Sequence, residues 1–227
     1  MKRNIFSTIN LLGLCLFLTA CGSDNSSPSS NNDPLPITTN PGDTPNKLAI
    51  LDTAGTVERV STDSTGQQGD QNSINSSISN DGQIVVFDSS SSNLVSNDTN
   101  LSFDIFAKNR RDNTTQRISV ATDGSQANDS SIDPKVTANG RYVVFSSDAS
   151  NLVLNDTNAV SDIFLHDILT GITMLISKDN NGVAGNGNSE AANISSDGRF
   201  VVFMSEATNF SVIDNNSLID IYLHDLS

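Results

Sequence analysis

Oxygen-bearing side chains recur every 58 positions in this chain (147 − 89 = 205 − 147 = 58), and they are its clearest candidates for chemistry. Five polar positions are identical in three copies of a repeated segment, whereas the residues between them vary. The three sets are Ser89, Asn93, Asp98, Asn100 and Asp104; Ser147, Asn151, Asp156, Asn158 and Asp162; and Ser205, Asn209, Asp214, Asn216 and Asp220. Polar identity inside variable loops indicates a specific role.

The last three positions of each set form the pattern Asp-x-Asn-x-x-x-Asp, which places three oxygen-bearing side chains on one short loop. Hard divalent cations take such ligands, so the pattern predicts a calcium site in each copy. The predicted ligands are Asp98, Asn100 and Asp104; Asp156, Asn158 and Asp162; and Asp214, Asn216 and Asp220. The loop is not an EF-hand, because the glycine at the sixth position and the terminal glutamate are missing.

A structural role is the alternative for the same side chains. Asp and Asn hydrogen-bond nearby backbone groups in turns, and an aspartate at the start of a strand can hold an adjacent loop. Three side chains also fall short of the six to eight oxygens that Ca²⁺ takes, so backbone carbonyls and water would have to supply the rest. Both interpretations stay open at the level of sequence.

Other catalytic patterns are missing from the sequence. It contains no Gly-x-Ser-x-Gly elbow, no Cys/His cluster with zinc spacing and no glycine-rich phosphate loop. His166 and His224 share one repeat position, which Lys108 holds in the first copy, so we do not expect a metal-binding histidine pair. The sequence therefore predicts a protein without catalysis of its own.

The elements that must position the polar residues repeat with the same period. Gly82, Gly140 and Gly198 each precede a Val-Val-Phe triplet, and a fixed period of this size indicates stacked supersecondary units. Each unit is predicted to hold four short strands, with a tight Asp-Gly or Asn-Gly hairpin between the first two. In the second copy the predicted strands are 135–137, 141–145, 162–167 and 172–177. The third of these should place Ile163 and Leu165 on one face and Phe164 on the other.

The strand motifs resemble a known repeat. Ile-Ser-x-Asp-Gly-x-x-Val-Val-Phe at 78–87 and 194–203 is similar to the TolB-type, WD-like β-propeller repeat, as is Asp-Ile-Phe/Tyr-Leu-His-Asp at 162–167 and 220–225. The resemblance covers about residues 47–227. It implies an all-β fold, a β-propeller-like array of about three four-stranded blades, which is fewer than the 4 to 8 of closed propellers.

The two ends of the repeat region concern the number of blades and whether the propeller is complete. Residues 48–52 and 57–61 align with the third and fourth strands, and the last copy stops after a third strand. In closed propellers the termini commonly share one blade in this way. Three interpretations stay open: a truncated gene product, which we favour, an open arc of blades, or closure through oligomerisation. A complete relative would have about six or seven blades.

The start of the chain predicts export. A basic Met1-Lys2-Arg3 precedes an apolar run over 9–18, the pattern of a secretory signal. The run ends in Leu-Thr-Ala-Cys at 18–21, which resembles the lipobox of bacterial lipoproteins and implies cleavage after Ala20 and lipidation of Cys21. A plain cleavable signal is the alternative. Cys15 would leave with the signal, so the mature chain would have no intrachain disulfide.

Three regions follow from composition. Residues 1–20 are predicted to be the lipoprotein signal peptide, 21–46 a disordered Ser/Asn/Pro tether, and 47–227 the β-propeller repeat domain. The net charge of −14 becomes −16 without Lys2 and Arg3, which argues against nucleic acid and against electrostatic docking on anionic lipid. Gly22, rather than aspartate, after the lipobox favours the outer membrane of a Gram-negative host, on its periplasmic or surface face.

The sequence thus predicts a lipid-anchored cell-envelope binding or scaffold module whose TolB-like propeller engages a protein partner. A calcium-stabilised surface or adhesion module is one alternative. A non-catalytic propeller fragment of a larger hydrolase is another. An oligomer is expected if the propeller is incomplete.

Overall fold

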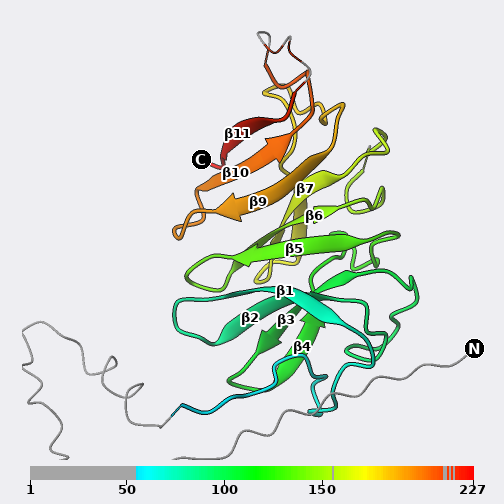
Figure 1. The fold of residues 1–227 in the computed structure, drawn as a ribbon, viewed down its shortest axis with the longest axis vertical. Coiled ribbons are helices and arrows are strands. Elements are labelled where there is room, and N and C mark those ends of the chain that lie inside the picture. The colour runs from blue at the N-terminus through cyan, green and yellow to red at the C-terminus, as the bar shows by residue number, and fades with distance from the viewer. Residues whose placement is uncertain (1–54, 155, 212–213, 215, 217) are drawn as a thin grey trace, which may run out of the picture. The chain divides into compact units, whose positions relative to one another are not determined.

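The computed structural model describes residues 55–154, 156–211, 214, 216 and 218–227, which are all loop, turn or strand (Figure 1). The predicted signal peptide, the tether with Cys21, and residues 47–54 lie outside the described residues. Thr56–Ser227 forms one compact unit. Within these ranges, no helix is long and apolar enough to cross a membrane.

The described strands form three antiparallel sheets that follow one another along the chain. In Figure 1 they stack in chain order, from β1–β4 to β9–β11. The first sheet holds β1 (Ser73–Ile78), β2 (Ile84–Ser89), β3 (Asp104–Asn109) and β4 (Thr114–Arg117). The second holds β5 (Ser131–Val136), β6 (Tyr142–Ser147), β7 (Asp162–Asp167) and β8 (Ile172–Leu175). The third holds β9 (Ser189–Ile194), β10 (Phe200–Ser205) and β11 (Asp220–Asp225). The predicted all-β array of three propeller-type blades is confirmed.

The strand bounds differ from prediction where the sequence is polar. β7 covers the predicted residues, but β5 begins at Ser131, four residues before the predicted start. The cause is a β-bulge in β5, where the register with β6 shifts between Ile132 and Lys135 and Asp133 has φ of 56°. Because a bulge inserts an unpaired residue, alternation does not reveal the first half of this strand.

Apolar side chains between consecutive sheets form the core. Ile105 and Ala107 of β3 pack with Val143 and Phe145 of β6 in one fully apolar cluster. One sheet further on, Ile163 and Leu165 of β7 pack in the same way with the third sheet, including Val201 and Phe203. Phe164 belongs to the first cluster, so the predicted two-faced pattern of β7 is confirmed. Among the described strands, the third sheet has no following sheet, and the residues of β11 that correspond to Ile163 and Leu165 are therefore exposed.

The prediction of a fourth strand at 57–61 is wrong for the described structure. These residues carry no strand, and the side chain of Val57 is fully exposed. Such a strand needs a third strand beside it, and the aligned residues 48–52 lie outside the described residues. The segment keeps one repeat feature, the isolated bridge Thr62 to Gln68, which recurs as Val120 to Gln126 and as Lys178 to Ala184.

Candidate functional site

The repeated serine at the end of each second strand holds the start of the first strand. In the second copy, Ser147 Oγ donates to the carbonyl of Ser130 at 3.1 Å and lies 2.9 Å from Ser131 Oγ. It also accepts a hydrogen bond from the amide of Ala149 at 3.1 Å. Ser89 and Ser205 make the corresponding bonds to Asn72 O and Asn188 O. This position is structural in all three copies.

The repeated asparagine after it ties its loop to the connection that enters the sheet. Asn151 Oδ1 accepts from the amide of Asn128 at 2.9 Å, and Asn151 Nδ2 donates to the carbonyl of Gln126 at 2.8 Å. Asn93 and Asn209 make the same pair of bonds at distances of 2.8 to 3.0 Å. An amide side chain is needed here because one group must both donate and accept.

The second repeated asparagine, fourth of the five positions, reaches forward to the connection that enters the next sheet. Asn100 Nδ2 donates to Ala127 O at 3.0 Å, and Asn158 Nδ2 donates to Gly185 O at 2.8 Å. Asn216 keeps only the local part of the pattern among the described contacts, in which its Oδ1 accepts from the amide of Leu218 at 3.0 Å.

In the first copy, an arginine supplies counter-charge to the two aspartates and a glutamine donates hydrogen bonds to both. Asp104 is fully buried and accepts 2.6 Å and 3.1 Å hydrogen bonds from Ser119 Oγ and Gln126 Nε2. Gln126 Nε2 also donates to Asp98 at 2.9 Å. The guanidinium of Arg117 lies 3.5 Å from Asp98 Oδ2 and 3.7 Å from Asp104 Oδ2. Burial raises the pKa of Asp104, while the hydrogen bond from Ser119 and the charge of Arg117 oppose that rise.

The second copy keeps the aspartates but loses the cation. Leu175 and Ala184 stand at the positions of Arg117 and Gln126. Asp162 accepts from Ser177 Oγ at 2.5 Å and from Asn158 Nδ2 at 2.6 Å. Burial raises the pKa of Asp162 to about 6 and also raises the pKa of Asp156.

The third copy lacks the partners that the first two have. Asp214 Oδ2 accepts from the hydroxyl of Tyr222 at 3.0 Å, whereas its buried Oδ1 has no hydrogen-bond partner among the described atoms. Burial and the hydrogen bond to Asp214 raise the pKa of Tyr222 to about 12. Within the described part of the chain, the Asp220 side chain takes part in no hydrogen bond or ion pair.

These contacts bear on the predicted calcium ligands. The described residues contain no group of three or more His, Cys, Asp or Glu side chains arranged for a metal ion. The first copy does not fit Ca²⁺, because Arg117 already supplies positive charge between Asp98 and Asp104. The second copy brings together two carboxylates without a cation, but Asn158 turns its amide nitrogen toward Asp162. Calcium binding stays a prediction.

The structure also contains a groove that sequence patterns did not identify. It has a volume of about 580 Å³ and lies between the loop at 121–123 and the loop at 151–154, with Thr173 at its side. Leu152 is buried beneath it, whereas Leu154 is 93% exposed. A related groove of about 410 Å³ occurs one repeat earlier, lined by Asp63–Thr65, Asn93–Ser96 and Thr115. Ser96 stands there in place of Leu154, so the apolar character belongs to the second groove.

Sequence reasoning missed Arg117, Ser119 and Gln126. Ser119 had a readable signal, because Ser61, Ser119 and Ser177 are spaced by the same period (119 − 61 = 177 − 119 = 58). It lies just after the fourth strand, outside the loop that carries the five repeated polar positions. Arg117 and Gln126 had a weaker signal, because each recurs one period earlier, as Arg59 and Gln68, but the second copy replaces both.

No protein-family model matches the chain, and no curated protein sequence matches it at a significant level. Among solved structures, the chain is similar to the putative TolB from Agrobacterium tumefaciens, with 16% identity and a TM-score of 0.44 over 68% of this chain and 46% of that chain. For TolB from Acinetobacter baumannii the identity is 18% and the TM-score 0.41, over 71% of this chain and 31% of that chain. The β-propeller domain of the Trilobed protease from Pyrococcus furiosus has 14% identity and a TM-score of 0.41, over 68% of this chain and 39% of that chain. This chain spans less than half the length of each.

Proposed function

We propose that this protein is a lipid-anchored scaffold of the bacterial cell envelope that binds another protein through the groove beside Leu154. The observation that carries the proposal is the groove itself, where a 93% exposed leucine borders a volume of about 580 Å³. Concave apolar surface with a few polar groups at its rim is typical of a binding site. The net charge of −14 favours a partner with positive charge around an apolar anchor.

The use of the repeated polar residues supports a scaffold without catalysis of its own. The serine and asparagine positions hold loops and strands together in every copy. Asp104 and Asp162, which begin the third strands of the first two sheets, accept hydrogen bonds from serines that follow the fourth strands. The polar side chains that could take part in catalysis therefore hold the loops and strands in place, which fixes the shape of the surface.

The groove is tested by crosslinking in intact cells and affinity capture of the full chain. We expect Leu154→Asp to lose a partner that the unchanged chain retains, because a carboxylate there replaces the apolar anchor. Leu169→Asp is the matched control, since Leu169 is an exposed leucine on the turn between β7 and β8. Equal capture by both variants, or capture of lipoprotein-sorting machinery alone, contradicts the proposal.

The anchor is tested separately. We expect Cys21→Ser to move the chain from the membrane fraction to the soluble fraction, because the thiol that would carry the lipid is gone. Cys15→Ser should leave the chain in the membrane fraction. If both variants stay with the membrane, Cys21 is not the anchor.

A calcium-stabilised surface or adhesion module is the second candidate, and the second copy favours it. Burial there raises the pKa of both Asp156 and Asp162, and Leu175 replaces the arginine of the first copy. A divalent cation would relieve this unfavourable pair of charges. Added calcium should then raise the melting temperature of the unchanged chain, with no effect on Asp156→Ala. A melting temperature that is the same in calcium and in EGTA contradicts this candidate.

A further inference from the structure

The third sheet ends in an exposed edge strand whose counterparts in the other sheets are covered. Ile221 and Leu223 of β11 are each 66% exposed, whereas Ile163 and Leu165 at the same positions of β7 are fully buried. Figure 1 shows β11 at one end of the array, with β10 on one side only. The unpaired edge of β11 is a template for pairing with another strand, and its exposed apolar face matches the surface that the next sheet covers in the second copy.

The polar groups at this end are also incomplete. In the first copy Asp98 and Asp104 are served by Arg117, Ser119 and Gln126. At the third copy, among the described atoms, Asp214 has a buried side-chain oxygen with no partner, and the Asp220 side chain makes no hydrogen bond. A buried unpaired carboxylate oxygen is costly, which indicates that a donor belongs there.

The missing donors occur at the other end of the same chain. Arg59, Ser61 and Gln68 stand one period before Arg117, Ser119 and Gln126. The residues that Arg59 and Ser61 would serve one period before Asp98 and Asp104 are Asn40 and Asn46, which carry no charge. One end thus has the donors without the carboxylates, and the other has the carboxylates without the donors.

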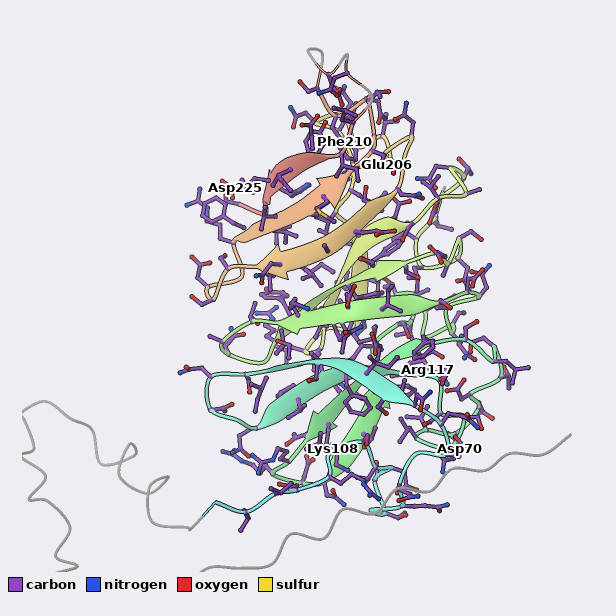
Figure 2. All side chains as sticks on the ribbon, in the orientation of Figure 1. Asp70, Lys108, Arg117, Glu206, Phe210 and Asp225 are labelled. Carbon is purple, nitrogen blue, oxygen red and sulfur yellow. The ribbon has the colours of Figure 1, made fainter. Side chains whose placement is uncertain are left out.

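Within one chain the two sets lie apart. Lys108 Nζ donates to the carbonyl of Asp63 at 2.9 Å, and Thr115 Oγ1 donates to Thr62 O at 2.6 Å, so this segment is held on the first sheet. Figure 2 shows Lys108 near one end of the array and Asp225, the last residue of β11, near the other. The second sheet packs between the first and third, and therefore separates the donors from the carboxylates.

We infer that a second copy of this chain completes the third sheet. Residues 56–59 of one copy pair with β11 of the other as its fourth strand, with Arg59 opposite Tyr222, as Arg117 is opposite Phe106. Arg59 and Gln68 then face Asp214 and Asp220, and Ser61 donates to Asp220. Two copies joined head to tail at both ends give a closed ring of about six blades, within the usual range of 4 to 8.

One exposed side chain on the outer face of the first sheet agrees with this pairing, although Phe87 and Phe106 on the same face are already buried within one chain. Ile78 of β1 is 57% exposed, whereas Val136 at the same position of β5 is 9% exposed, because the first sheet covers it. In the ring, the third sheet of the second copy covers Ile78 in the same way. Apolar surface at both ends of the array is thereby removed from water.

The experiment is native mass spectrometry of the full chain released from detergent micelles. We expect the unchanged chain to be a dimer. Arg59→Glu and Asp220→Arg should each be monomeric at the same concentration, because like charges then meet at both junctions. An equal mixture of the two variants should form a 1:1 dimer. One contact between the copies then keeps the natural Arg59 and Asp220, and the other joins the two substituted residues, whose charges are again opposite. This rescue also shows that both variants fold.

Matched charge changes away from the two ends serve as controls. Arg111→Glu and Asp129→Arg alter exposed residues on the β3–β4 and β4–β5 connections, and both should remain dimeric. The inference is overturned if the unchanged chain is monomeric or polymerises without a defined dimer. It is also overturned if either end variant stays dimeric alone, or if the mixture of the two stays monomeric.

Discussion

The hydroxyl of Ser177 donates a 2.5 Å hydrogen bond to the buried carboxylate of Asp162, and the same oxygen accepts from the amide of Ile163 at 2.9 Å. Ser119 makes the same two contacts with Asp104 and Ile105 in the first copy. One hydroxyl therefore joins the start of the third strand to the end of the fourth. This bridge explains why an aspartate begins β3 and β7.

The Asp162 carboxyl should titrate near pH 6, because burial penalises its charged form more than two hydrogen bonds favour it. A folded pKa above the unfolded value means that the native state binds the proton more tightly. The contribution of Asp162 to stability is therefore greatest below about pH 4, and it is lost as the pH rises to about 6. Carbon-13 NMR of the assigned carboxyl measures the midpoint.

Asp123 is the control for that titration. It is exposed, and hydrogen bonds from Ser125 lower its pKa, so its resonance should shift below pH 4. Ser177→Ala should move the Asp162 midpoint further upward and destabilise the fold at pH 7 by about 1–3 kcal/mol in urea unfolding. A midpoint near pH 4 for Asp162 in the unchanged chain would show that the carboxylate is not desolvated.

Arg117→Leu should destabilise the chain at pH 7 by about 3 kcal/mol, because Asp98 and Asp104 lose their buried counter-charge. The loss should be smaller at pH 5. Removing the guanidinium raises the already elevated pKa of Asp104, and protonation then neutralises the carboxylate. Urea unfolding at the two pH values measures both effects. Arg111→Leu, at an exposed position, should change stability by no more than about 0.5 kcal/mol, and an equal loss in both variants contradicts the role of Arg117.

Gly140→Ala should destabilise the chain by about 2–4 kcal/mol, the sum of backbone strain and overpacking. Gly140 has φ of +73°, and a Cβ atom there would lie 2.8 Å from Cγ1 of Ile84 in the first sheet. Gly171 is the matched control, with the same φ of +73° and no atom within 4 Å of its Cβ position. Gly171→Ala should therefore show the strain alone, about 1–2 kcal/mol. Thermal or urea unfolding of the pair gives the difference, and equal values would mean that the sheets do not pack closely at Gly140.

Asn151→Ala should reduce stability by about 1–3 kcal/mol, because the amide of Asn128 and the carbonyl of Gln126 each lose a partner. Hydrogen exchange at the Asn128 amide should also become faster than in the unchanged chain. Asn151→Asp keeps the acceptor for Asn128 and so should preserve protection of that amide, although it loses the bond to Gln126. Unchanged exchange in Asn151→Ala would show that the side chain does not hold this connection.

Much of the fold could be predicted from the sequence, because residues that make the same packing contacts in each sheet recur at the same repeat position. The Val-Val-Phe and Asp-Ile-Phe triplets correctly predicted β6, β7 and the two faces of Ile163 and Phe164. The start of β5 could not be predicted, since a bulge at Asp133 breaks its alternation. The strand expected at 57–61 failed for another reason, because strand pairing needs a neighbour that local sequence does not supply.

The sequence by itself determined the period, the order of strands and the identity of the polar residues, because each follows from comparing three copies of one unit. Only the tertiary structure decided what those residues do. Whether Asp98 and Asp104 face a metal ion or an arginine depends on Arg117, which comes from the fourth strand and is replaced by leucine in the second copy. The groove beside Leu154 likewise arises where segments far apart in sequence meet, and local sequence patterns do not reveal such contacts.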